Sequence, residues 1–219
     1  MNTSAKKTAP EPIRDQKADH LLTPKNTVIA LIDYQSTQLD TLKSKTRERA
    51  ELNVRVLSEV ARRWGVPIVV STVGVDMGVN PPTIPEIMEH LPKDQEEIDR
   101  TGVNAWEDAD FRAAIEATGA KHVVVAGLWT EVCVALPTLD MLNEGYKVYP
   151  VVDAIGGISK EAHESAITRM VQAGASPVTA ISFASEIMRN WAREDSNNLR
   201  EIFGWYFPAK EELDQKEDY

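Results

Sequence analysis

The sequence contains a single cysteine among its 219 residues, and this scarcity excludes an internal disulfide bond. Chains without disulfides are typical of reducing compartments, so we expect a cytoplasmic protein. No apolar run approaches the roughly 20 residues that a membrane helix needs. The polar N-terminus lacks the apolar stretch of a secretory signal. The composition therefore predicts no membrane partner.

Basic residues are also scarce relative to acidic ones. The 24 Lys and Arg residues face 34 Asp and Glu residues, which gives a formal net charge of -10. Nucleic-acid binding needs clustered positive charge, so we expect no nucleic-acid partner. The four histidines (His20, His90, His122 and His163) lie far apart, without the short spacing of metal ligands. We therefore expect no metal and no cofactor.

The remaining composition is that of a globular protein, with 42% apolar and 26% charged residues. Residues 1–24 are rich in Lys, Pro, Ala and Thr without apolar periodicity, which predicts a flexible N-terminal tail. Residues 25–198 are expected to form one domain. Residues 199–219 form a C-terminal arm that is first aromatic and then charged. Such an arm docks either on its own domain or on a neighbouring subunit.

Apolar runs and helical patterns alternate along the domain. Strands are predicted for residues 27–33, 67–73, 122–128, 147–153 and 177–183, and helices for 47–64, 108–118, 130–144, 160–173 and 184–194. A glycine just after several of these helices favours a left-handed cap. The regular alternation predicts an α/β fold, a doubly wound, mainly parallel sheet with helices on both faces.

Three reactive side chains follow predicted strands, and ligands of open α/β sheets bind at that edge. Asp33 ends the first strand, Arg100 follows a short segment, and Cys133 follows the strand 122–128. If Thr130 caps the next helix, Cys133 lies in its first turn. The helix dipole there favours a thiolate, so we expect a lowered thiol pKa. Free backbone N–H groups of the same turn could form an oxyanion hole.

Spacing alone leaves plainer interpretations open. A lone cysteine is more often an inert core residue than a nucleophile. An aspartate after a strand commonly caps a loop, and an arginine commonly forms a surface ion pair. The residue pattern thus suggests a thiol site without establishing it.

Four segments together resemble the isochorismatase-like cysteine hydrolase superfamily, in particular its YcaC-related branch. They are Asp33-Tyr-Gln35, Val103-Asn-Ala-Trp106 followed by Asp108, Ala126-Gly-Leu-Trp-Thr-Glu-Val-Cys-Val134 and Glu144-Gly-Tyr-Lys-Val148. The similarity covers roughly residues 21–191. It implies a Rossmann-like three-layer fold and a catalytic Asp-Lys-Cys triad.

The resemblance gives several residues a role. Asp33 corresponds to the general base and Cys133 to the nucleophile. Trp129-Thr130 corresponds to the family's cis peptide bond, and the amides of Thr130 and Cys133 to the oxyanion hole. One position departs from the pattern, because Arg100 stands where the superfamily usually has lysine. A guanidinium stays protonated, so it can stabilise a thiolate but cannot shuttle a proton.

Three more residues are candidates for substrate binding. Gln35 lies beside the aspartate, where it either supports a loop or touches substrate. Asn104 and Trp106 stand where the family uses a small polar residue and an aromatic ring. They line the pocket or simply pack. The irregular segment 74–93 is expected to set the shape of the pocket.

The resulting prediction is hydrolysis of a small-molecule substrate at an amide or carbamoyl C–N bond through a thioester. Isochorismatases proper cleave a vinyl ether without a cysteine nucleophile, so Cys133 favours acyl chemistry. The alternative is a catalytically silent protein of the same fold that binds a ligand or serves in assembly. The resemblance implies a homo-oligomer in either case.

Overall fold

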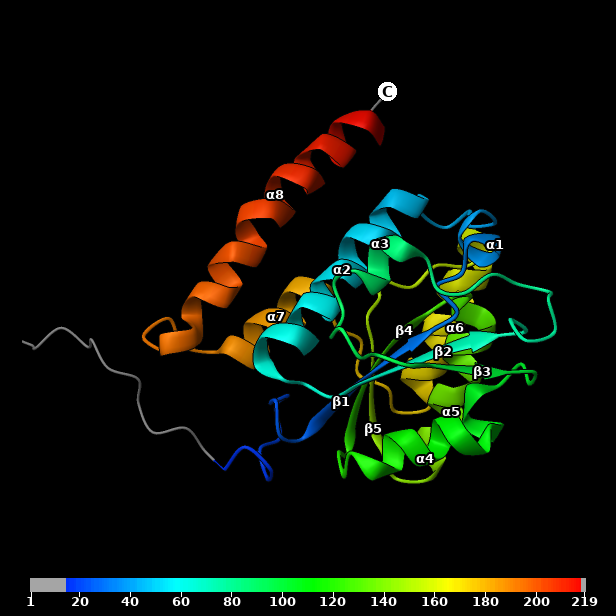
Figure 1. Cartoon of the computed structure of the whole chain (residues 1–219), viewed down its shortest axis with the longest axis horizontal. Coiled ribbons are helices and arrows are strands. Elements are labelled where there is room, and N and C mark those ends of the chain that lie inside the picture. Colours follow the sequence, from blue (N-terminus) through cyan, green and yellow to red (C-terminus); the bar gives the residue numbers. More distant parts are fainter. Residues whose placement is uncertain (1–14, 218–219) are drawn as a thin grey trace, which may run out of the picture.

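A computed structural model describes residues 15–217 and the side chains of residues 15–216. In this part of the chain five parallel strands form one sheet in the order β3-β2-β1-β4-β5 (Figure 1). The strands are β1 (Thr27–Ile32), β2 (Ile68–Val73), β3 (Glu97–Arg100), β4 (His122–Gly127) and β5 (Lys147–Pro150). The predicted α/β fold is confirmed, and the sheet is parallel throughout.

The two central strands form the core of the sheet. Every residue of β1 and β4 is buried, as their continuous apolar sequences predict for strands covered on both faces. Their register pairs Ile32 with Gly127. A Cβ atom at Gly127 would lie 2.7 Å from the carbonyl oxygen of Ile32, so only glycine fits this end of β4. The close approach brings the ends of β1 and β4 together.

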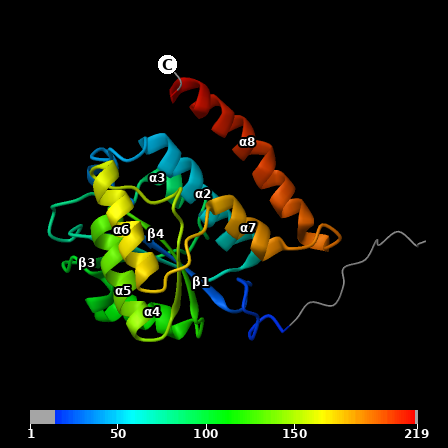
Figure 2. The same cartoon turned by 180° about the vertical axis from the view of Figure 1, so that it is seen from behind.

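Helices cover both faces of the sheet, with α2 and α7 on one side and α4, α5 and α6 on the other (Figures 1 and 2). The helices are α1 (Ser36–Leu39), α2 (Arg47–Trp64), α3 (Pro85–Met88), α4 (Ala109–Ala117), α5 (Ala135–Asn143), α6 (Lys160–Gln172), α7 (Ala180–Met188) and α8 (Asn197–Glu217). A π-helical turn, Thr130–Val134, precedes α5. None of the helices between residues 15 and 217 combines the length and hydropathy that spanning a bilayer requires.

The prediction of a strand at 177–183 and a helix at 184–194 is wrong. Within that segment Val178 makes only an isolated bridge to Val151, and α7 already begins at Ala180. Thr179 and Ser182 form a capping box, in which each side chain accepts a hydrogen bond from the other residue's backbone N–H. The two caps start a helix in the middle of an apolar stretch.

The described part of the predicted tail contacts the domain. Leu22 is fully buried, and its N–H donates to Glu186 at 2.7 Å. Asp19 accepts a hydrogen bond from the Arg189 guanidinium at 2.5 Å. Residues 15–24 therefore pack against the end of α7, although their composition suggests a tail. Residues 1–14 lie outside the described residues.

The C-terminal arm forms α8, which packs along α2 of its own domain (Figure 1). The Tyr206 hydroxyl donates to Asn53 at 2.9 Å, and the guanidinium of Arg55 lies 4.0 Å from the centre of the Trp205 ring. Phe207 remains half exposed. The aromatic residues therefore serve packing within the subunit, and Phe207 leaves some apolar surface free. Residues 218–219 lie outside the described residues.

Candidate active site

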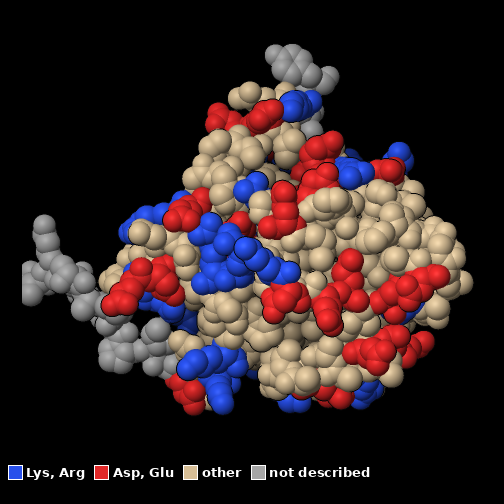
Figure 3. Space-filling model, viewed as in Figure 1, with Lys and Arg blue, Asp and Glu red and all other residues tan. Residues whose placement is uncertain are grey.

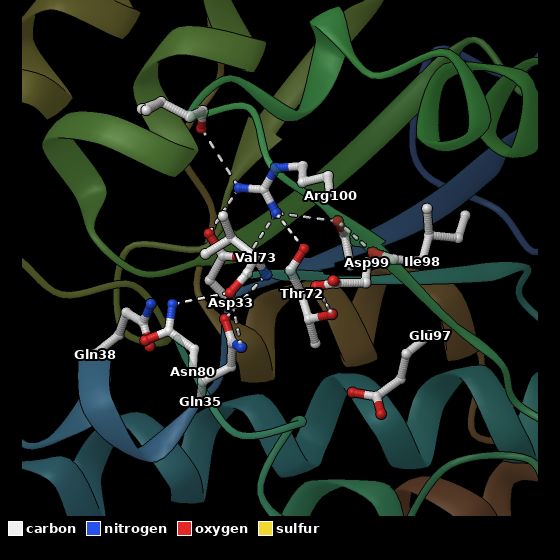
Figure 4. A network of polar contacts seen from close by, with 12 residues as sticks. Asp33, Gln35, Gln38, Thr72, Val73, Asn80, Glu97, Ile98, Asp99 and Arg100 are labelled. Carbon is white, nitrogen blue, oxygen red and sulfur yellow. Dashed lines mark hydrogen bonds and ion pairs between the residues drawn. The ribbon is translucent and has the colours of Figure 1, made fainter. Parts of the chain in front are cut away.

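Asp33 lies directly after β1 with its side chain fully buried (Figure 4). Its N–H donates to the carbonyl of Ser71 at 2.9 Å, which extends the pairing of β1 with β2 by one residue. Its φ is +58°, in the left-handed region that aspartate tolerates better than most residues. This turn of the backbone places the carboxylate at the carboxyl edge of the sheet.

Arg100, the last residue of β3, binds this carboxylate with both terminal nitrogens. Nη1 donates to Oδ1 at 2.6 Å and Nη2 to Oδ2 at 2.7 Å (Figure 4). Nη1 also donates to the Ser71 hydroxyl and to the Thr72 carbonyl, and Nη2 donates to the Val103 carbonyl. Burial alone would lower the pKa of Arg100, but the hydrogen bonds and charge of Asp33 outweigh it and raise the pKa. The result is a buried, bidentate ion pair.

Cys133 lies in the π-helical turn and is 8% exposed, with its thiol close enough to Asp33 to feel its charge. Burial, followed by the charge and hydrogen bond of Asp33, raises the pKa of the Cys133 thiol to about 12. Arg100 and the N–H of Trp129 act in the opposite direction but do not compensate. The predicted lowering of this pKa is therefore wrong, because desolvation and a carboxylate outweigh the helix terminus.

The predicted cis bond and one predicted oxyanion donor also need correction. The cis peptide joins Leu128 and Trp129, one bond before Trp129-Thr130. The N–H of Leu128 still pairs with Ile32 at the end of the sheet, whereas the N–H of Thr130 donates to the Gly156 carbonyl at 2.9 Å. The Thr130 amide is thus committed to a backbone bond. The N–H of Trp129 instead lowers the pKa of the Cys133 thiol, which indicates that it lies near the sulfur.

A cavity of about 410 Å³ opens beside the thiol. Besides Cys133, its lining is entirely uncharged: Thr37, Gln38, Thr41, Val73, Asn80, Val103, Leu128, Trp129 and Val132. In Figure 3 the right-hand edge of the molecule, where Figure 1 shows α1 and the loop after β2, is mostly uncharged. The exposed apolar side chains of Met77 and Val79 belong to that loop. The site therefore suits a small ligand without net charge.

The three predicted substrate-binding residues lie outside this lining. Gln35 is fully buried and donates to the carbonyls of Val73 and Pro81, so it supports the loop after β2. The Asn104 amide donates to Asp140 at 2.7 Å, and the Trp106 indole donates to Glu144 at 3.0 Å. For all three residues the geometry favours the structural alternative.

Sequence reasoning missed the polar part of the lining. Thr37, Gln38 and Thr41 come from the four-residue helix α1 and the turn after it, which are too short to show any periodicity. Asn80 belongs to the segment 74–93, which was expected to shape the pocket but gave no signal for a particular residue. Trp129, noted only for the cis bond, also lines the cavity, and its indole donates to Thr41 at 2.8 Å.

The histidines stand apart from the thiol. His163 on α6 contacts the Thr130 hydroxyl at 2.8 Å, and its partial burial lowers its pKa to about 4. His122 is buried at the start of β4. Among residues 15–216, no three His, Cys, Asp or Glu side chains gather in a geometry that could hold a metal ion.

Comparison with known proteins decides the family. The model of the isochorismatase domain matches residues 27–182, which include Asp33, Arg100 and Cys133. The chain belongs to the isochorismatase family. It is 35% identical to the "Probable hydrolase YcaC" of Escherichia coli (strain K12) over 181 residues, which cover 82% of this chain and 86% of that protein. This isochorismatase-family member is accordingly a hydrolase of the YcaC-related branch.

Solved structures agree with this assignment. YcaC from Pseudomonas aeruginosa, described with hexane-2,5-diol and covalent acrylamide, superposes with a TM-score of 0.82 at 33% identity. The match covers 91% of this chain and 98% of that one. The YcaC gene product of Escherichia coli, described as an octameric hydrolase of unknown specificity, superposes with a TM-score of 0.81 at 33% identity. That match covers 92% of this chain and 98% of that one.

Proposed function

We propose that this isochorismatase-family hydrolase is a cysteine hydrolase that cleaves the C–N bond of a small uncharged amide or carbamoyl compound. The observation that carries the proposal is the contiguous arrangement of the Cys133 thiol, the Asp33 carboxylate and the Arg100 guanidinium at the end of an uncharged cavity. A nucleophile, a base and a group that orients the base are the parts that acyl transfer requires.

The high thiol pKa determines how the nucleophile would act. At neutral pH Cys133 is a protonated thiol beside the Asp33 carboxylate. Each carboxylate oxygen accepts one bond from Arg100 and has a further lone pair, so Asp33 can receive the proton as the sulfur bonds to the substrate carbon. Asp33 then delivers the proton to the leaving nitrogen, and the C–N bond breaks. A thioester on Cys133 remains.

Water would complete the cycle. Asp33 takes a proton from a water molecule as its oxygen attacks the thioester carbon, and the C–S bond then breaks. The sulfur recovers its proton from Asp33, so the enzyme returns to its initial state with one amine and one acid released. Throughout these steps Arg100 keeps both carboxylate oxygens in place and needs no proton transfer of its own.

The negative charge that develops on the substrate oxygen requires N–H donors. The amides of Trp129 and Cys133 are the candidates, because the Trp129 N–H acts on the pKa of the thiol and Cys133 lies within the first turn of a π-helix. The Thr130 amide is excluded by its bond to Gly156. The pair of donors therefore differs by one residue from the pair that the sequence suggests.

Relatives add two supporting facts. The Pseudomonas aeruginosa structure carries covalent acrylamide, a reagent that adds to nucleophiles such as thiols, and Cys133 is the single cysteine of this chain. The Escherichia coli structure is octameric. We propose that this chain likewise reacts at Cys133 and assembles as a homo-oligomer.

The test of the proposed function is ammonia or amine release from a panel of small neutral amides and carbamoyl compounds. The wild-type chain should turn over at least one of them, and Cys133→Ser should reduce turnover by at least about a thousandfold. Both proteins should melt at similar temperatures, which would show that the variant is folded. Turnover retained by Cys133→Ser would refute the thioester mechanism. A wild-type chain that is inactive on the whole panel would favour the silent binding protein.

A further inference from the structure

Gln38 presents a buried polar group to the cavity beside Cys133. The side chain comes from α1 and is only 8% exposed, yet it belongs to the cavity lining (Figure 4). One end of its amide lies against the Thr37 hydroxyl, with Oε1 2.6 Å from Oγ1. Within the described residues the other end has no hydrogen-bond partner. That end borders the cavity, where a ligand can form the hydrogen bond that the protein does not supply.

The neighbouring hydrogen bonds decide which atom of the amide faces the cavity. The Thr37 hydroxyl lies 2.6 Å from Gln38 Oε1 and 2.9 Å from Asn80 Oδ1, but it has one proton and can donate to only one of them. Asn80 is fixed because its Nδ2 donates to the Val73 carbonyl at 2.8 Å. Turning the Gln38 amide by 180° lets the single Thr37 proton go to Asn80 and leaves only the atom at the cavity without a protein partner. Its nitrogen then donates to Thr37, Thr37 donates to Asn80, and the Gln38 oxygen faces the cavity.

We infer that Gln38 determines specificity by accepting a hydrogen bond from an N–H of the substrate. The inference deepens the proposed function and rests on it for the position of the reacting carbonyl group. Apart from the thiol, the other polar side chains of the lining are already hydrogen-bonded, and the paired charges of Asp33 and Arg100 lie outside the lining. The preferred substrates are therefore primary amides and carbamoyl compounds with a short apolar group.

The same oxygen disfavours close analogues. A carboxylate would place negative charge against the Gln38 oxygen. An ester or ketone lacks the N–H and would leave that oxygen buried and unpaired. Such an unpaired group weakens binding by about tenfold to a hundredfold relative to the amide.

The test compares two competitors that differ only in this group. Isobutyramide has an NH2 group where 3-methylbutan-2-one has a methyl group. Methyl acrylate, which lacks an N–H, labels the full-length chain. Its β-carbon bonds to the Cys133 sulfur, and the thiol proton moves to its α-carbon. Intact mass gives the labelling rate without ambiguity because the chain has one cysteine. Isobutyramide should halve this rate at a concentration at least tenfold below that of the ketone.

Two variants complete the experiment. Gln38→Met has a similar volume without the amide, so it should remove the difference between the two competitors, each measured against the methyl acrylate labelling rate of the same variant. Gln38→Glu keeps an oxygen acceptor and should retain the preference for the amide. Equal protection in the wild type, no protection by isobutyramide, or a preference that persists in Gln38→Met would overturn the inference. The readout is binding, so its failure is distinct from a failure of turnover.

Discussion

Replacing Asp33 by asparagine should make Cys133 more reactive towards alkylating reagents while it abolishes turnover. Three influences raise the pKa of Cys133: burial, the charge of Asp33 and its hydrogen bond to the thiol. Asp33→Asn removes the charge and weakens the hydrogen bond, because an amide oxygen has no net charge. It also leaves the positive charge of Arg100, which lowers the thiol pKa, without its carboxylate partner. The thiolate should therefore form at lower pH.

The size of the effect follows from the pKa. A value of about 12 lies roughly three and a half units above that of a free thiol, near 8.5. Burial is the largest cause and persists in the variant, so the pKa should not fall the whole way. A decrease of about one unit already raises the thiolate fraction tenfold at any pH well below the pKa. We therefore expect alkylation at pH 7.5 to be at least about tenfold faster in Asp33→Asn than in the wild type.

The assay is the rate of iodoacetamide labelling against pH, followed by intact mass. An unfolded chain would also label rapidly, so the variant must show the native near-ultraviolet circular dichroism signal and a rate unchanged by low urea. Asp99→Asn is the matched control. Asp99 lies on β3 next to Arg100, but its carboxylate binds the backbone N–H groups of Val75 and Asp76. A wild-type midpoint below about 8.5, or slower labelling in a folded Asp33→Asn, would refute this account of the thiol.

Two further predictions concern stability. The pKa of His163 is lowered to about 4 from an ordinary value near 6.5, so the unfolded chain binds more protons between these values. The free energy of unfolding should decrease by about 1–2 kcal/mol as the pH falls from 6.5 to 4, a value reduced for partial exposure. Urea titrations should show a smaller decrease in His163→Gln. Gly127→Ala should destabilise the fold by about 3 kcal/mol or more, since its Cβ would lie 2.7 Å from the carbonyl oxygen of Ile32. A melting temperature within about two degrees of the wild type would contradict the second prediction.

Much of the fold was predictable because its elements carry strong local signals. The strand at 27–32 is a continuous apolar run, and the helix at 47–64 is capped by Thr46 at its start and Gly65 at its end. The segment 177–183 was misassigned because its apolar residues fit either structure. Whether this segment forms a strand or a helix depends on two short side chains, Thr179 and Ser182, which cap a helix. The periodicity of apolar residues carries no information about such hydrogen bonds between side chain and backbone.

The candidate site was predictable to the extent that it follows from topology. Asp33, Arg100 and Cys133 each follow or end a parallel strand, and parallel strands end at one edge of a sheet. The cavity lining was not predictable, because it depends on how α1 and the loop after β2 pack over that edge. The shift of the Cys133 pKa was predicted in the wrong direction for a related reason. The helix dipole is visible in the sequence, whereas burial and the contact of Cys133 with Asp33 arise from tertiary structure.

Arg100, which stands where the superfamily usually has lysine, suits a mechanism in which this residue orients Asp33 and transfers no proton. Arg100 donates to both oxygens of Asp33 and to Ser71, Thr72 and Val103, so one side chain joins the ends of β1 and β2 to a residue that lines the cavity. A lysine ammonium has three donors on a flexible stem and could not reach all five of these acceptors from one rigid, planar group. The guanidinium therefore fixes the position of the carboxylate more rigidly than an ammonium would. In the proposed mechanism proton transfer then remains with Asp33, the one carboxylate among the described residues whose charge shifts the pKa of the thiol.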